Sequence, residues 1–217
     1  MTAFESGAAT DVGQVRALNE DTFVVAGTVF VVADGMGGHN GGEIASRIAV
    51  DRLAAIGPVN SINDLVRGVQ EANADIRKRA REQPEVRGMG TTEVMLADIE
   101  RAGSHRLGVA NVGDSRLYRL TDSGLHQHTE AHSLVEALVR DGRLTRAEAA
   151  VHPQRNIVTR ALGIDDKVLV DAWELIPVVG DRYVLCSDGL FGEIDDGEIQ
   201  EVLQATIPPP DPYETYE

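Results

Sequence analysis

Short β-branched segments occur in three separate stretches of this 217-residue chain, and their distribution limits the possible folds more than any other feature. Residues 23–25 and 29–33 are two apolar runs split by Ala-Gly-Thr, which predict two buried strands joined by a tight turn. Further strands are predicted at residues 91–98, 106–112, 116–120, 168–173 and 182–186. Because these strands are grouped apart from the helical patterns, an α+β layered fold is favoured over a repeat of strand–helix–strand units.

Helical patterns fill the gaps between the strands. Apolar residues recur on one helical face through residues 45–56, and Gly57-Pro58 ends this pattern. A second helix is predicted to start at Ser61, in a capping box whose serine hydroxyl accepts a backbone N–H. A polar, partly helical segment follows at residues 130–163, and a last helix is expected at about residues 196–203.

Acidic residues stand beside glycine where three predicted strands leave the core: Asp34-Gly35, Gly113-Asp114 and Asp188-Gly189. Carboxylates that converge at strand ends repel one another unless cations neutralise them. Oxygen ligands suit hard ions such as Mg²⁺ or Mn²⁺, and two such ions together can activate water and hold a phosphoryl oxygen. One Asp-Gly pair alone is usually a turn. Three pairs after strands favour a metal site.

The glycine-rich segment at residues 34–43 could instead cradle a nucleotide, but it departs from both common templates. Counting from Gly37, a phosphate-binding loop requires lysine where this chain has Glu43. Counting from Gly35, the dinucleotide pattern requires glycine where this chain has Asn40. The sequence therefore argues against a nucleotide site here.

The charge balance and the cysteine content exclude several other classes. The chain has 35 acidic and 20 basic residues, a net charge of −15, which disfavours binding to nucleic acid. The single cysteine, Cys186, rules out a disulfide framework and a multi-cysteine zinc site, and its place at the end of an apolar run favours a buried thiol. Residues 1–16 lack a secretory pattern, and the longest apolar stretch is too short for membrane insertion. We expect a cytoplasmic protein.

Six segments occur in an order that resembles one known family. They read RALNED at residues 16–21, DGMGGH at 34–39, GTT at 90–92, GDSR at 113–116, HPQRN at 152–156 with TRALG at 159–163, and CSDGL at 186–190. Together they resemble the metal-dependent protein serine/threonine phosphatases of type 2C, in their compact bacterial form, over about residues 11–203. The resemblance implies a four-layer α-β-β-α sandwich, with a central antiparallel β-sandwich flanked by helices.

The same resemblance implies a chemistry: hydrolysis of phosphoserine and phosphothreonine by metal-activated water at a binuclear Mg²⁺ or Mn²⁺ centre. Asp34 would bridge the two metals, the Gly35 carbonyl would bind one of them, and Asp188 the other. Asp114, with Asp188, would help hold a third and weaker metal. Asn156 would approach this metal from the side of the flap, a segment that the family carries before HPQRN. The substrates would be proteins that serine/threonine kinases have phosphorylated.

Other residues are assigned supporting roles by the resemblance. Arg16 would clamp the substrate phosphate, while Glu20 and Asp21 would orient metal-bound waters. Some relatives have a histidine, proposed as a general acid, where this chain has Met36, which cannot donate a proton. We expect water to serve as the acid here.

The sequence departs from the family pattern in two places. Ala131 stands where the family usually has aspartate, and no Asp-Asn pair follows Leu203 to supply a further ligand of the first metal. We expect a phosphatase domain at residues 1–206, incomplete at its C-terminal end, and a proline-rich acidic tail at 207–217. An uncovered sheet edge there would permit dimerisation or strand exchange.

Two other functions stay open at this point. The first is a catalytically weakened or silent phosphatase-like module that binds phosphoproteins, and the second is a magnesium-dependent hydrolase of small phosphate esters. The remaining candidate residues have simpler interpretations. His126, His128 and His132 are expected on a solvated surface, and Trp173 in the core.

Overall fold

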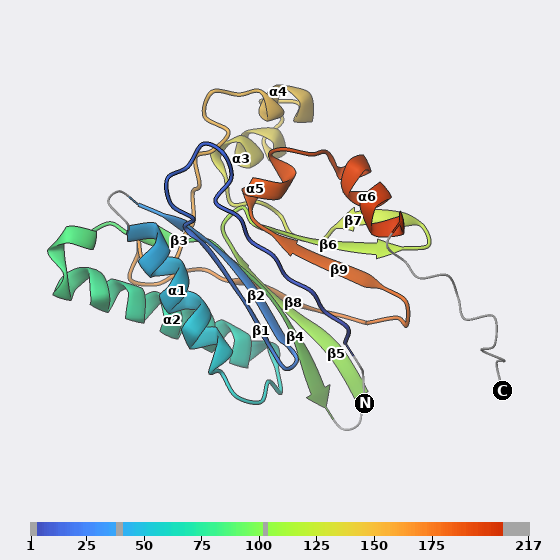
Figure 1. The fold of residues 1–217 in the computed structure, drawn as a ribbon, viewed down its shortest axis with the longest axis horizontal. Helices are drawn as coiled ribbons and strands as arrows, with labels where there is room; N and C mark the ends of the chain where they lie inside the picture. Colours follow the sequence, from blue (N-terminus) through green and yellow to red (C-terminus); the bar gives the residue numbers. More distant parts are fainter. Residues whose placement is uncertain (1–3, 38–40, 102–103, 206–217) are drawn as a thin grey trace.

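The computed structural model describes residues 4–37, 41–101 and 104–205. Its larger sheet is antiparallel and has the strand order β1-β2-β4-β5-β8, and the short strand β3 pairs with the end of β2 (Figure 1). The bounds of these strands are β1 Asp21–Ala26, β2 Val29–Met36, β3 Gly90–Thr91, β4 Glu93–Arg101, β5 Ser104–Val112 and β8 Asp171–Leu175.

A smaller antiparallel sheet of order β7-β6-β9 packs against the larger one. Its strands are β6 Arg116–Thr121, β7 Gly124–Gln127 and β9 Arg182–Cys186. Helices α1 (Gly41–Ala54) and α2 (Ile62–Glu82), with the 3-10 turn Pro84–Val86, cover the outer face of the larger sheet. Helices α5 (Asp188–Phe191) and α6 (Asp196–Ala205) lie on the smaller sheet, which completes four layers.

Alternation along the strands explains why the layers stack in this order. On β4, Met95, Ala97 and Ile99 face the helices α1 and α2, whereas Val94 and Leu96 face the smaller sheet. A further core around Tyr118 and Cys186 joins the smaller sheet to α5 and α6. Because successive side chains point to opposite faces, each central strand contributes to two cores at once, and the predicted four-layer sandwich is confirmed.

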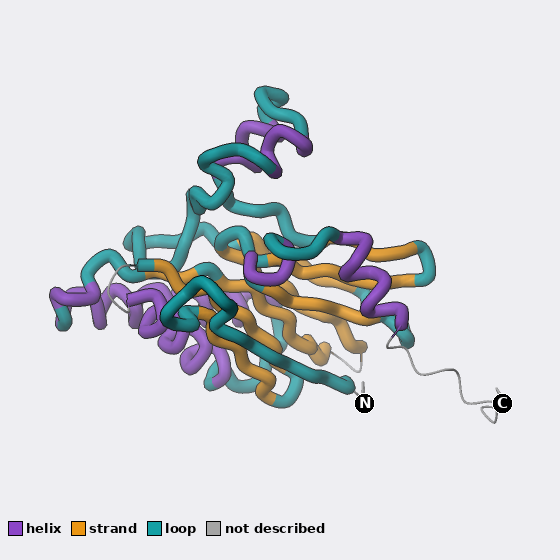
Figure 2. The backbone as a smooth tube through the Cα atoms, turned by 45° about the horizontal axis from the view of Figure 1, so that its top comes forward, coloured by secondary structure: helices purple, strands orange, loops and turns teal. Residues whose placement is uncertain are grey.

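Helices α3 (Leu134–Arg140) and α4 (Arg146–Ala150) project away from the sandwich (Figures 1 and 2). They belong to a segment whose two ends meet, because Ser133 and Val158 form an antiparallel bridge. We name residues 133–158 the flap. It lies at the end of the sandwich where β2, β5 and β9 finish.

The structure confirms most of the predicted elements and corrects others. Strand β8 starts at Asp171, not at residue 168, and the sequence patterns missed β7 and α5. The capping box is wrong in detail: the Ser61 hydroxyl accepts no backbone N–H and lies 3.0 Å from a carboxylate oxygen of Asp64, to which it donates. The predicted tail at residues 207–217 lies outside the described residues. Within the described part of the chain, no helix has the length and apolar character that crossing a membrane requires.

Candidate metal and phosphate site

The three acid–glycine pairs lie at one end of the sandwich. Asp34 is near the end of β2, Asp114 follows β5, and Asp188 begins α5 directly after β9. Asp21, the first residue of β1, is the register partner of Asp34. Burial, together with repulsion from Asp21, Asp188 and Asp114, raises the pKa of Asp34 to about 8. The four carboxyl groups are therefore close enough to act on one another electrostatically.

The pKa values of the neighbouring carboxyl groups of Asp114 and Asp21 are raised as well. Burial, reinforced by the charge of Asp188, raises the pKa of Asp114 to about 6. Burial also raises the pKa of Asp21, against the effect of a 2.6 Å hydrogen bond that the Ser187 hydroxyl donates to its carboxylate. Repulsion of this kind within one cluster is the condition that bound cations relieve.

Two adjacent threonines fix the backbone of Asp34. The Thr92 hydroxyl accepts from the Asp34 N–H at 3.1 Å, and the Asp34 carbonyl accepts from the Thr92 N–H and the Thr91 hydroxyl, both at 2.9 Å. The Thr92 hydroxyl also lies 2.7 Å from that of Ser115, next to Asp114. Both threonines are buried, so this pair connects the ends of β2 and β5 rigidly. The sequence showed these threonines only as part of a family motif, with no role attached.

Gly35 is held in a space that admits no side chain. A Cβ at this position would lie 2.2 Å from the carbonyl oxygen of Gly42 and 2.6 Å from that of Glu20. The Gly35 N–H donates to that Glu20 carbonyl at 3.1 Å. Only glycine therefore lets the end of β2 lie against residue 20 and the start of α1.

Arg16 and Glu20 form the exposed side of the site. An Arg16 guanidinium nitrogen lies 3.6 Å from a Glu20 carboxylate oxygen, and the Arg16 side chain is 76% exposed. The Glu20 backbone is anchored, since its carbonyl accepts a 2.6 Å hydrogen bond from the buried Ser46 hydroxyl. A solvent-facing guanidinium on an anchored segment is free to meet an incoming anion.

Asn156, expected as a further metal ligand, belongs to the flap. Asn156 lies exposed in a turn of the flap, and no hydrogen bond of the described residues joins it to Asp34, Asp114 or Asp188. The role expected for it as a metal ligand therefore stays a prediction.

The interpretation of His132 as a surface histidine is wrong. Its side chain is only 8% exposed, and its Nδ1 accepts a 2.9 Å hydrogen bond from the N–H of Gly113, the residue before Asp114. Its Nε2 lies 3.0 Å from a carboxylate oxygen of Asp171. Burial lowers the pKa of His132. Local sequence gave no signal of this, because the partners of His132 lie 19 and 39 residues away.

His126 and Cys186 agree with expectation, whereas His128 is less exposed than expected. His126 is exposed and His128 is partly buried. Cys186 is buried at the end of β9, and burial raises the pKa of its thiol to about 12. A thiol so far from ionising is a packing residue and no nucleophile.

The side chains fit divalent cations that keep part of their water shell. Among the described residues, no three His, Cys, Asp or Glu side chains form a group that alone could hold a metal ion. Two or three carboxylates with a backbone carbonyl still suit Mg²⁺ or Mn²⁺, which complete their coordination with water. The raised pKa of Asp34 supports this fit, since a nearby cation would stabilise its charged form.

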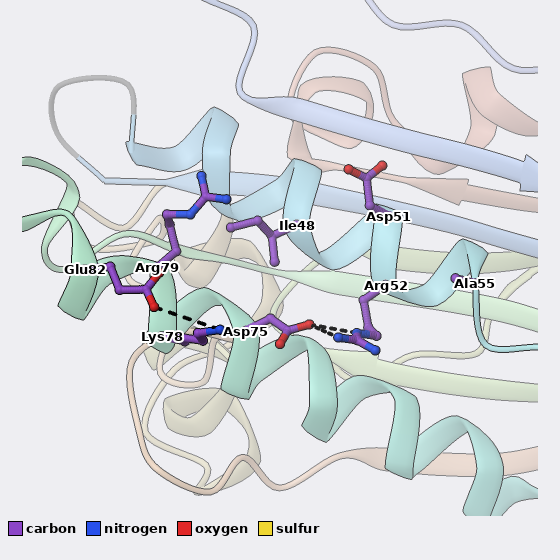
Figure 3. A pocket seen from close by; sticks show the side chains of 8 residues that line it. All are labelled: Ile48, Asp51, Arg52, Ala55, Asp75, Lys78, Arg79 and Glu82. Carbon is purple, nitrogen blue, oxygen red and sulfur yellow. Dashed lines mark hydrogen bonds and ion pairs between the residues drawn. The ribbon is translucent and has the colours of Figure 1, made fainter.

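A hollow of about 370 Å³ lies elsewhere, on the outer surface between α1 and α2 (Figure 3). Four of its charged side chains form two pairs: Arg52 contacts Asp75 at 2.5 Å, and Lys78 lies 3.9 Å from Glu82. It contains none of the strand-end carboxylates. We therefore place the chemistry at the carboxylate cluster and not in this hollow.

Comparison with known proteins gives a consistent result. The model of the family described as protein phosphatase 2C matches residues 14–214. The serine/threonine phosphatase stp of Listeria innocua is 38% identical over 209 residues, covering 90% of this chain and 81% of that protein. The serine/threonine protein phosphatase PstP of Mycobacterium tuberculosis is 41% identical over 202 residues, which cover 91% of this chain but 38% of that longer protein.

A solved structure extends the likeness to three dimensions. The catalytic domain of the serine/threonine protein phosphatase PstP, crystallised in complex with two manganese ions, is 38% identical to this chain. The two structures superpose with a TM-score of 0.77, over 90% of this chain and 81% of the other.

Proposed function

Because the chain belongs to the protein phosphatase 2C family, we propose that its strand-end carboxylates hold two divalent cations at which phosphoserine and phosphothreonine are hydrolysed. The protein is a serine/threonine protein phosphatase with a divalent metal cofactor, and its substrates are phosphoproteins. A silent phosphatase-like binding module is not favoured, since the relatives are named as phosphatases.

The metal ligands in this proposal are Asp34, the Gly35 carbonyl and Asp188, with Asp114 beside a third and weaker ion. Bound cations of this type lower the pKa of water and neutralise charge on the phosphoryl group. Manganese is the more direct candidate, because a structurally similar phosphatase domain was crystallised with two manganese ions. Magnesium offers the same hard-oxygen chemistry.

The chain itself contributes positioning and charge. Arg16 is exposed beside Glu20 and can bind two oxygens of the substrate phosphate. Asp21, held by Ser187, and Glu20, anchored through its backbone to Ser46, would orient water near the ions. Met36 supplies no proton, so solvent water would protonate the leaving alcohol. We further infer that the opposing enzymes are serine/threonine kinases.

The observation that carries the proposal is the electrostatic state of Asp34. Its pKa of about 8 arises from burial and from three neighbouring carboxylates, an arrangement that is unfavourable without cations. Four acids supplied by β1, β2, the turn after β5 and α5 have no packing reason to converge at one point.

The first experiment is hydrolysis of p-nitrophenyl phosphate with and without millimolar Mn²⁺, for the wild-type chain and for Asp34→Ala. Turnover that requires Mn²⁺ and disappears in Asp34→Ala is expected. Asp51→Ala, which removes an exposed carboxylate of α1 at the hollow of Figure 3, is the matched control and should retain turnover. A folded wild-type sample without turnover at any Mn²⁺ concentration would overturn the proposal. Phosphopeptides compared with sugar phosphates would separate a protein phosphatase from a small-ester hydrolase.

A further inference from the structure

His132 and Gly113 are joined by two reciprocal hydrogen bonds. The His132 N–H donates to the Gly113 carbonyl at 2.8 Å, and the Gly113 N–H donates to the His132 Nδ1 at 2.9 Å. Gly113 has a φ of +114°, which glycine adopts readily, and a Cβ there would lie 2.5 Å from the Thr92 side chain. The turn that carries Asp114 is therefore fixed on one side by His132 and on the other by Thr92.

The same histidine stands at the root of the flap. Its carbonyl accepts a 2.8 Å hydrogen bond from the Thr159 N–H, just beyond the other end of the flap. The next hydrogen bond along the flap, from the Leu134 N–H to the Ile157 carbonyl at 2.9 Å, lies two residues further out. His132 is thus bonded directly both to the Asp114 turn and to the point where the flap returns.

The imidazole ring is oriented from the opposite side by strand β8. Because Nδ1 accepts from Gly113, the proton of the neutral ring lies on Nε2, which donates to Asp171 at 3.0 Å. Arg160, next to Thr159, donates to the other oxygen of the same carboxylate at 2.6 Å. The same Arg160 nitrogen also lies 2.8 Å from Nε2, and the Asp171 carboxylate accepts from both of these donors.

We propose that His132 is a positioning residue that sets the flap and the Gly113–Asp114 turn in a fixed relation to each other. The proposal rests on the proposed function for its effect on catalysis, but not for its structural content. Each bond involves a buried or backbone group, and an unsatisfied buried donor at Gly113 would be costly. Losing the Nδ1 acceptor would therefore loosen the Asp114 turn, and with it the His132 backbone on which the flap closes.

Three substitutions of His132 distinguish the role of Nδ1 from that of Nε2. His132→Asn keeps an acceptor close to the place of Nδ1, His132→Gln keeps a polar group close to the place of Nε2, and His132→Ala keeps neither. His126→Ala, at an exposed histidine on β7, is the matched control. If the hydrogen bond to Gly113 fixes the Asp114 turn, the His132→Asn variant should resemble the wild type in amide exchange and activity. The His132→Gln and His132→Ala variants should not.

The first readout needs neither metal nor substrate. In the metal-free protein, amide hydrogen exchange at Gly113 and Thr159 should be faster by about tenfold or more in the His132→Ala and His132→Gln variants. The increase should be much smaller in His132→Asn. Limited proteolysis within the flap should follow the same order. Slower or unchanged exchange at both amides in His132→Ala would overturn the proposal.

The second readout is catalysis with Mn²⁺. For a phosphopeptide, kcat/KM is expected to fall about tenfold in Ala and Gln, with a rise in the Mn²⁺ concentration needed for half-maximal rate, and Asn should recover most of the loss. Equal impairment of Asn, Gln and Ala would instead assign His132 to general packing and refute a positioning role. A wild-type protein without turnover would count against the proposed function, while the exchange experiment would still decide the role of His132.

Discussion

The Ser187 hydroxyl donates a 2.6 Å hydrogen bond to the carboxylate of Asp21, a residue 166 positions earlier in the chain. Asp21 begins the edge strand β1 of the larger sheet, and Ser187 follows β9 of the smaller sheet. Ser187 also stands at the N-cap of α5, yet its side chain makes no capping hydrogen bond. The hydroxyl is therefore committed to Asp21 and ties the two sheets together beside Asp34 and Asp188.

Removing this hydroxyl should weaken both the fold and the reaction. Ser187→Ala is expected to lower the free energy of unfolding by about 1.5–3 kcal/mol, the range for a hydrogen bond to a charged group. The pKa of Asp21 should rise further, because the bond that lowers it is lost, so the acidic limb of the pH–rate profile should move to higher pH. Denaturant titration and a pH series with a phosphopeptide measure the two effects. Ser187→Thr keeps the hydroxyl, and an equal loss in that variant would contradict the explanation.

Asp34→Asn should stabilise the metal-free protein while abolishing turnover. The folded-state pKa of about 8 lies above the usual 3.8, so between these values the folded state retains a proton that the unfolded chain has lost. Wild-type stability therefore decreases as the pH rises through this window. At pH 8 the variant should be more stable by on the order of 2 kcal/mol, and the difference should vanish near pH 4.

Thermal unfolding with and without Mn²⁺ tests this expectation. A cation that binds the native state stabilises it by mass action, so Mn²⁺ should raise the melting temperature of the wild type much more than that of Asp34→Asn. An equal rise in both proteins would show that Asp34 is no ligand.

Glu93 should make folding sensitive to pH for a reason unrelated to catalysis. Its carboxylate is fully buried on the helix-facing side of β4, it has no hydrogen-bond partner among the described residues, and burial raises its pKa well above 4.5. Stability should fall as the pH rises above about 4.5, with a limiting slope of about 1.4 kcal/mol per pH unit. Glu93→Gln should flatten this dependence. Glu93→Met should, in addition, raise stability at pH 8, as denaturant titrations at several pH values can show. A slope that survives in both variants would exclude Glu93 as its source.

Gly35→Ala should damage the site through sterics alone. The added Cβ meets two backbone carbonyl oxygens, of Gly42 and Glu20, which cannot move without shifting α1 or residue 20. We expect kcat/KM for p-nitrophenyl phosphate to drop at least about tenfold, together with a loss of about 1–3 kcal/mol in stability. Gly7→Ala is the control, since nothing lies within 4 Å of a Cβ at that position. Normal Mn²⁺-dependent turnover in Gly35→Ala would disprove the tight fit.

The sequence predicted the strands well where several apolar residues follow one another, as in β2 and β9. It missed β7, whose Gly-Leu-His-Gln has none of that composition and pairs only because β6 lies beside it. The meeting of Asp34, Asp114 and Asp188 could be anticipated, because each lies close to the end of a strand and these strands finish at one end of the sandwich.

The burial of His132 could not be anticipated in this way. Its environment is created by Gly113 and Asp171, which the chain brings together only after both sheets have formed. The clamp of Thr91 and Thr92 on Asp34 has the same origin, since those residues are 57 and 58 positions apart from it. Local patterns report periodicity, whereas these contacts depend on sheet register.

The bridge between Ser133 and Val158 has a consequence for how such a protein can diversify. Since the flap leaves and returns at neighbouring positions, it is attached to the sandwich as a self-contained insertion. A flap of different length or composition could be spliced between these two residues at little entropic cost, leaving the strand ends and their carboxylates in place. The flap can therefore be exchanged in evolution while the scaffold that carries the carboxylates is preserved.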